Sequence, residues 1–153
     1  MKFKIALIGL LLFFAYDRAN AEASLSNAAP RDLKLFIDPS SAAVPGGKVN
    51  LSVGLLNLKG GNFVGDYHIK VVPYFFQNEK GKLTMTAPEE SLRKLTNQIA
   101  VDFVGQAVSS SGQINRIDGK ITPTNQEHGA VMLWFMSGKR KMIFQTTYHF
   151  GEK

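Results

Sequence analysis

Cysteine is absent from this chain of 153 residues. Its absence excludes disulfide bonds, catalysis by a thiol, metal sites built from thiolates and a lipid-anchored cysteine. The sequence also contains no catalytic-nucleophile motif, no glycine-rich phosphate loop and no P-loop. The sequence therefore lacks the motifs of most common classes of enzyme.

Side chains that could bind a metal ion are few and poorly spaced. His68, His128 and His149 lie far apart in the sequence, without the spacing of metal ligands. Met132 and Met136 are separated by about 13 Å along an extended strand, which is too far for two sulfurs to share a copper ion. We therefore expect no metal, no cofactor and no enzymatic activity. The alternative is an enzyme of unrecognised type that acts through histidine and aspartate.

The excess of positive charge is modest. Lys and Arg number 18 against 12 Asp and Glu, which gives a formal net charge of +6 at pH 7. No basic motif interleaved with aromatic residues accompanies this charge, so we do not expect nucleic-acid binding. The charge is compatible with contact to anionic polymers of a cell envelope.

No apolar run is long enough to cross a bilayer. Ile5–Ala15 has about eleven residues where a membrane-spanning helix needs roughly 20. Lys2 and Lys4 precede this run and Ala19-Asn20-Ala21 follows it, which predicts a signal peptide over residues 1–21. We expect cleavage after Ala21, a flexible leader at 22–32, a single β domain at 33–153 and no transmembrane segment. Export without cysteine favours the bacterial periplasm or secretion from the cell.

What the sequence does contain is a series of four alternating apolar segments. They are Ile99–Val108, Ile114–Thr122, Gly129–Met136 and Lys141–Phe150, separated by turn-forming residues at 109–113, 123–128 and 137–140. Alternation with a period of two, bounded by Gly, Ser, Pro and Asn, predicts antiparallel strands joined by tight turns.

Folding each turn symmetrically also predicts which residues face one another. The expected pairs are Val101 with Ile121, Phe103 with Gly119, Gly105 with Ile117, Ile121 with Val131, Gly119 with Leu133, Ile117 with Phe135, Phe135 with Met142, and Leu133 with Phe144. A slip of one residue would turn any strand over, yet all four agree on one apolar face. We expect Gly119 to make room for Phe103, and Gly105 to make room for Ile117.

The opposite face of these strands supplies a candidate partner-binding surface. Its members are Trp134, Met132, Met136, Ile143, Arg116 and Lys141. Exposed Trp and Met beside charged residues are typical of contact surfaces. The alternative is that the same chain covers this face with a helix over residues 86–97, where Thr86-Ala-Pro-Glu89 resembles a capping box and Leu92 and Leu95 form an apolar stripe.

The densest positive charge is at the last predicted turn. Lys139, Arg140 and Lys141 follow one another there. They form a candidate contact for anionic lipid headgroups or acidic polysaccharide. The alternative is a solvated turn that protects the edge of a sheet.

The N-terminal third carries a family resemblance. Leu33-x-Leu-x-Ile-Asp-Pro, then Val44-Pro-Gly-Gly-Lys-Val-Asn-Leu-Ser-Val, then Asn57, is similar to the opening strands of bacterial immunoglobulin-like domains. The resemblance implies an antiparallel β-sandwich, here with one short helix, and no particular activity. The alternative is an open antiparallel barrel or curved sheet with a helix, in which the apolar run Val71–Phe76 lines the mouth.

Two functions follow from these alternatives. The first is an exported, non-enzymatic envelope domain that contacts a protein, polysaccharide or lipid partner through the surface of Trp134. The second is a periplasmic carrier of an apolar ligand such as a lipid.

Overall fold

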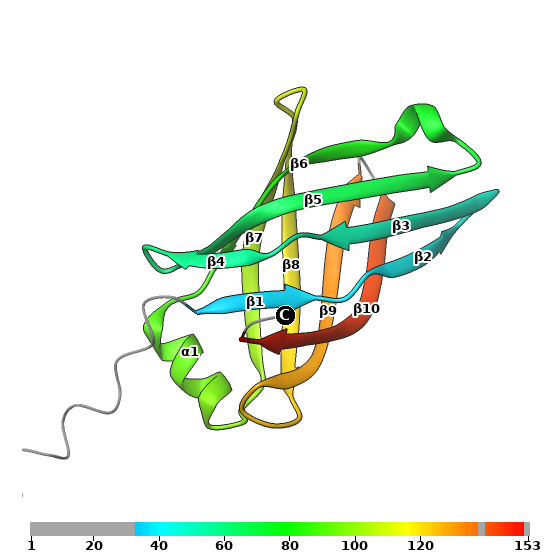
Figure 1. The fold of residues 1–153 in the computed structure, drawn as a ribbon. Helices are drawn as coiled ribbons and strands as arrows, with labels where there is room; N and C mark the ends of the chain where they lie inside the picture. The colour runs from blue at the N-terminus through cyan, green and yellow to red at the C-terminus, as the bar shows by residue number, and fades with distance from the viewer. Residues whose placement is uncertain (1–32, 138–139, 152–153) are drawn as a thin grey trace, which may run out of the picture.

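The fold is seen in a computed structural model that describes residues 33–137 and 140–151 (Figure 1). The predicted signal peptide, the predicted leader and Lys139 lie outside these residues. The strands are β1 (Lys34–Ile37), β2 (Ser40–Val44), β3 (Gly47–Val53), β4 (Leu56–Lys59), β5 (Asn62–Val72), β6 (Glu79–Thr86), β7 (Val101–Ser109), β8 (Ile114–Pro123), β9 (His128–Ser137) and β10 (Arg140–Phe150). A short 3-10 helix, η1 (Phe75–Gln77), follows β5, and the α-helix α1 (Glu89–Thr96) follows β6.

β1 and β2 together form one interrupted strand of the wall, and β3 and β4 together form a second. β1 pairs with β4, and β2 pairs with β3. β4 and β3 in turn pair with successive parts of the same edge of β5, because β6 occupies its other edge. The interruptions fall at Asp38-Pro39 and at Gly54-Leu55. The chain continues past Pro39 directly into β2.

The ten segments therefore form an eight-stranded antiparallel β-barrel with neighbouring strands in chain order. β5 pairs with β6, and β1 pairs with the last residues of β10, where Leu35 faces Phe150. These pairings leave one continuous wall, so the predicted β-sandwich is wrong and the alternative barrel is confirmed. A sandwich and a barrel bury alternate residues in the same way, and only the pairing of the first strand with the last distinguishes them here.

The predicted hairpin registers are confirmed in β7 to β10. Each of the eight expected pairs is present, and Phe103, Ile117, Leu133 and Phe144 are buried in one core. A Cβ atom at Gly119 would lie 2.2 Å from Cζ of Phe103, so this glycine does make room for the ring.

The expected role of Gly105 is wrong. The atoms nearest to a Cβ at this position belong to the backbone of Thr84 and Met85 on β6, the nearest being the Thr84 carbonyl oxygen at 2.4 Å. Gly105 therefore allows a neighbouring strand to approach and does not accommodate Ile117. Its cross-strand partner on β8 is nevertheless Ile117, as predicted.

Helix α1 lies at the end of the barrel where β6 leads into β7 (Figure 1). Leu92 and Leu95 are buried in the core, as the apolar stripe predicts. The capping box is not formed, because Thr86 ends β6 and Pro88 is the N-cap residue, without a side-chain cap hydrogen bond. Asn97 caps the C-terminus, and its N–H donates to the carbonyls of Arg93 and Leu95.

Candidate functional site

The barrel wall opens where β2 separates from β10. At the seam, where the first strand of the barrel meets the last strand β10, the Asp38 N–H donates to the Thr147 carbonyl and the Thr146 hydroxyl donates to the Asp38 carbonyl, both at 3.0 Å. The next residue, Pro39, has no N–H with which to extend this ladder. Beyond it, within the described residues, β2 is hydrogen-bonded as a strand only to β3.

A cleft of about 1120 Å³ lies at this opening. It occupies the end of the barrel that contains the β2–β3, β5–β6, β7–β8 and β9–β10 connections, which we call the open end; α1 lies at the other end. Much of its lining is apolar, including Ala42, Val49, Val71, Phe135, Met142 and Ile143. Side chains fill the rest of the barrel interior, where most inward-facing residues are buried.

The lining also contains polar groups, among them Ser41, Gln77, Asn115, Lys141 and one carboxylate. Glu79 is partly buried and accepts a hydrogen bond from the hydroxyl group of Tyr67, which is itself buried inside the barrel. Burial raises the pKa of Tyr67, and the hydrogen bond and the negative charge of Glu79 raise it further. The tyrosine therefore remains a neutral donor, and the carboxylate is held in place with acceptor capacity left for a ligand.

The sequence did not single out Glu79, although a signal was present. Glu79 has the same strand parity as the buried residues Leu83 and Met85 on β6. A carboxylate on the inward parity of a strand requires a partner or a function. Of the apolar run Val71–Phe76, which was expected to line the mouth of a barrel, Val71 and Tyr74 line the cleft, whereas Phe75 and Phe76 are exposed to solvent.

The six residues of the candidate partner-binding surface lie together on the outer wall of β8, β9 and β10. In the ladder Trp134 faces Ile143, and Met136 faces Lys141. These residues divide between two sites, because Met136, Lys141 and Ile143 also line the cleft, whereas Met132, Trp134 and Arg116 do not.

Trp134 is neither fully exposed nor covered by the helix. Its ring is half-buried, with Nζ of Lys141 at 5.0 Å from the ring centroid. Pro88 and Ser91, at the start of α1, line a shallow hollow beside it. Arg116 forms an ion pair with Asp118 at 2.7 Å and so faces a neighbouring carboxylate. Arg140 is described as the first residue of β10.

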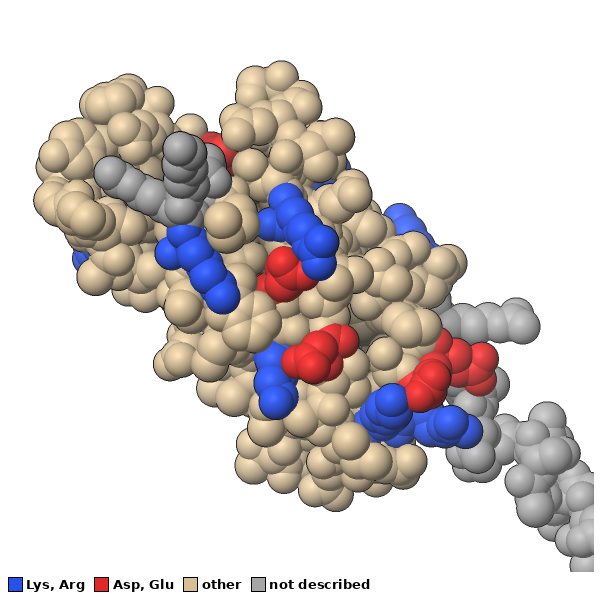
Figure 2. Space-filling model, turned by 180° about the vertical axis from the view of Figure 1, so that it is seen from behind, with Lys and Arg blue, Asp and Glu red and all other residues tan. Residues whose placement is uncertain are grey.

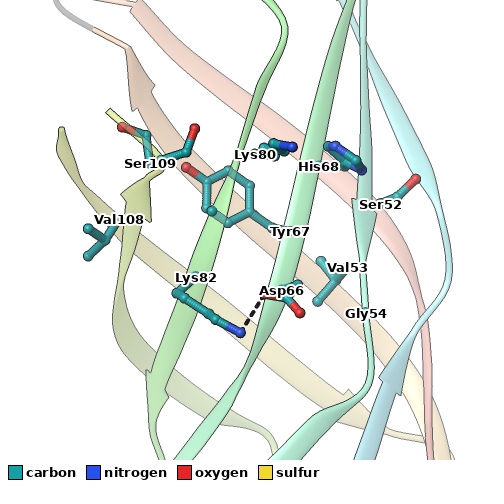
Figure 3. A pocket seen from close by; sticks show the side chains of 12 residues that line it. Ser52, Val53, Gly54, Asp66, Tyr67, His68, Lys80, Lys82, Val108 and Ser109 are labelled. Carbon is teal, nitrogen blue, oxygen red and sulfur yellow. Dashed lines mark ion pairs between the residues drawn. The ribbon is translucent and has the colours of Figure 1, made fainter. Parts of the chain in front are cut away.

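A second hollow of about 750 Å³ lies on the outer wall across β5 and β6 (Figure 3). Asp66 and Lys82 form an ion pair across it at 2.6 Å. The Ser109 hydroxyl accepts a hydrogen bond from the Gln113 N–H at 2.9 Å, so it is engaged in closing the β7–β8 turn. These groups do not form an arrangement of nucleophile and base. No group of three His, Asp or Glu residues within the described ranges is placed to hold a metal ion.

Charge on the back of the molecule is mixed. Figure 2 shows Lys and Arg interspersed with Asp and Glu over that face, and most of the acidic side chains lie in its middle and lower parts. A mixed surface of this kind does not favour wrapping by a long anionic polymer.

Comparisons of the chain with family models, curated proteins and solved structures found no match. In the described part of the chain, no helix has the length and apolar character that crossing a membrane requires. The function must therefore be inferred from the geometry of the cleft and of the surfaces around it.

Proposed function

We propose that this protein is an exported, non-enzymatic carrier of an apolar ligand such as a lipid, located in the bacterial periplasm or secreted. The observation that carries the proposal is the cleft between β2 and β10. The apolar part of its mixed lining is suited to a hydrocarbon body, and the carboxylate of Glu79 is suited to a polar group that donates a hydrogen bond.

The architecture supports this function in a second way. Eight-stranded barrels have interiors that are either filled by side chains or wide enough for one small ligand near the mouth. Here both conditions occur in one barrel, because the interior is packed along most of its length and the cleft is confined to the open end. A cleft of about 1120 Å³ is of the size that binds a single small ligand.

The test fills the cleft and measures binding of a fluorescent fatty acid. Ala42 lines the cleft from β2 and is buried. In Ala42→Phe the added ring occupies ligand space, and we expect binding to weaken at least about tenfold, the effect of losing burial for two methylene groups. The matched control is Ala130→Phe, which adds the same ring at an exposed position of β9 outside the cleft.

Circular dichroism and the melting temperature of both variants establish that the barrel is intact. Native mass spectrometry of the protein recovered from its own compartment is the second measurement, and we expect a co-purifying lipid. A protein recovered without lipid, together with equal fatty-acid binding by both variants, would refute the carrier function.

A second candidate function is contact with an envelope protein or polysaccharide through the outer wall. The observation that favours it is the exposure of Met136 and Ile143, at 41% and 46%, beside Trp134 and Lys141. The same recovery experiment separates the two candidates, because this function predicts a co-purifying macromolecule and no lipid in the cleft.

A further inference from the structure

The β5–β6 tip presents two adjacent aromatic rings to solvent. Phe75 is 63% exposed and Phe76 is 83% exposed. Single exposed apolar residues are ordinary, but two consecutive phenylalanines on a projecting tip form an apolar patch with nothing covering it among the described residues. The tip extends beyond the barrel wall at the open end (Figure 1).

The local structure holds these rings outward. The 3-10 helix η1 is closed by hydrogen bonds from the Gln77 N–H to the Tyr74 carbonyl at 2.9 Å, and from the Asn78 N–H to the Phe75 carbonyl at 3.2 Å. The side chain of Asn78 accepts a hydrogen bond from the Val71 N–H at 2.9 Å, which fixes the tip to the end of β5. The exposed rings are therefore presented by an ordered turn.

The sign of the charge around the open end is the second, independent observation. The described segments that form this end are 39–53, 67–82, 104–117, 133–137 and 140–146. They contain a single acidic residue, Glu79, which faces the cleft and bonds to Tyr67. Their described basic residues are Lys48, Lys70, Lys80, Lys82, Arg116, Arg140 and Lys141.

Four of these basic side chains are exposed close to the tip or the cleft. Lys82 and Arg116 form ion pairs with acidic residues. Lys48 faces Val72 at the end of β5, Lys70 precedes the tip, and Lys80 follows it. Lys141 lies on the opposite rim of the cleft. Asp38, Asp66 and Asp118 directly adjoin these segments, and Asp66 and Asp118 are the partners in the two ion pairs.

We propose that the open end docks on an anionic phospholipid membrane, with Phe75 and Phe76 inserted among the headgroups and Lys48, Lys70, Lys80 and Lys141 contacting lipid phosphates. Apolar side chains inserted at the boundary of headgroups and acyl chains, together with lysines, are two signals of the kind that reversible membrane attachment needs. This inference goes beyond the carrier function: it names the surface on which the protein docks, and it places the cleft against that surface.

The experiment is flotation of the purified protein with vesicles of phosphatidylglycerol and phosphatidylethanolamine, compared with vesicles of phosphatidylcholine alone. We expect binding to the anionic vesicles, weakened at least about tenfold by the double substitution Phe75→Ser and Phe76→Ser. Lys70→Gln and Lys80→Gln should each weaken it roughly fivefold. The matched control is Ile99→Ser, since Ile99 is 52% exposed beside α1 at the opposite end.

The Ala42→Phe variant separates this inference from the carrier function, because it should lose fatty-acid binding and retain vesicle binding. Equal binding of the double Phe variant and the Ile99→Ser control to anionic vesicles would overturn membrane docking, as would equal binding of the unmodified protein to neutral vesicles. A change of oligomeric state caused by the double substitution, with no change in vesicle binding, would instead assign the tip to contact with a second copy of the chain and would also overturn it.

Discussion

Two tyrosines inside the barrel differ in how their hydroxyl groups are satisfied. Tyr67 and Tyr148 are each 2% exposed. The hydroxyl of Tyr67 donates to Glu79, whereas that of Tyr148 is buried without a hydrogen-bond partner among the described residues. Burial raises the pKa of both groups, so both remain neutral at physiological pH.

This difference predicts opposite effects for the same substitution. Tyr67→Phe leaves a partly buried carboxylate without its donor and should lower the free energy of unfolding by about 1.5–3 kcal/mol. Tyr148→Phe removes an unpaired hydroxyl and should raise the free energy of unfolding by about 1 kcal/mol. Urea unfolding at neutral pH measures both values, and each variant serves as the control for the other. Equal losses in the two variants would mean that the Tyr67–Glu79 hydrogen bond contributes no net stability.

At the level of strands, the Phe103 ring of β7 packs over Gly119 of β8. A Cβ at Gly119 would lie 2.2 Å from Cζ of Phe103 and 2.6 Å from the carbonyl oxygen of Met132 on β9. Gly119→Ala should therefore force the strands apart and cost about 1–3 kcal/mol of unfolding free energy, the usual range for overpacking a core.

A double-mutant cycle identifies which contact is responsible. Phe103→Leu shortens the ring side chain, so Gly119→Ala should cost less in the Phe103→Leu background than in the unmodified protein. The measurement is the midpoint of urea unfolding for the four proteins. Additive effects would show that the backbone of β9, rather than the Phe103 ring, limits the space. Gly112→Ala is unsuitable as a control because Gly112 has a positive φ of 84°.

The same strands show what the sequence determines without help from the rest of the chain. β7 to β10 are joined by short turns, and a strand has only two faces, so the apolar pattern selects between two parities. The predicted pairs of Phe103 and Gly119, and of Leu133 and Phe144, follow from that choice. Gly105 was misread because its close neighbour is on β6, which is separated from β7 by α1 and is not part of the series of tight turns.

The candidate site was predictable only in part for a related reason. Val71–Phe76 is a local sequence feature, and its two apolar faces indicated a mouth or rim. The opening beside it depends on where β2 leaves β10, which are segments from opposite ends of the described chain. Pro39 marks that point, but a proline in a sequence is equally consistent with a turn and with an interruption of a strand.

On the scale of the whole molecule, a few residues decide between a barrel and a sandwich. Leu35 is fully buried, and it faces Phe150 on β10 and Leu56 on β4. It therefore joins the first strand to both of its neighbours at the seam. The pairing of β1 with a strand at the other end of the chain cannot be predicted from hydrophobic periodicity, because periodicity indicates only the face of the sheet on which a residue lies.

If the β1–β10 pairing makes the barrel unfold as one cooperative unit, a destabilising substitution at the seam should lower the stability of all the strands together. Leu35→Ala should cost about 2–5 kcal/mol of unfolding free energy, and Leu55→Ala, at a position 37% exposed, should cost much less. Trp134 is the sole tryptophan and lies on β9, separated from β1 by β10, so its fluorescence reports the β7–β10 side of the wall rather than the β1–β10 pairing itself. We expect the urea transitions followed by Trp134 fluorescence and by circular dichroism to coincide in the unmodified protein and in Leu35→Ala, both shifted together. A variant in which β-structure is lost before the Trp134 signal changes would mean that β7 to β10 fold as a separate sheet, and that the seam closes the barrel without stabilising these four strands.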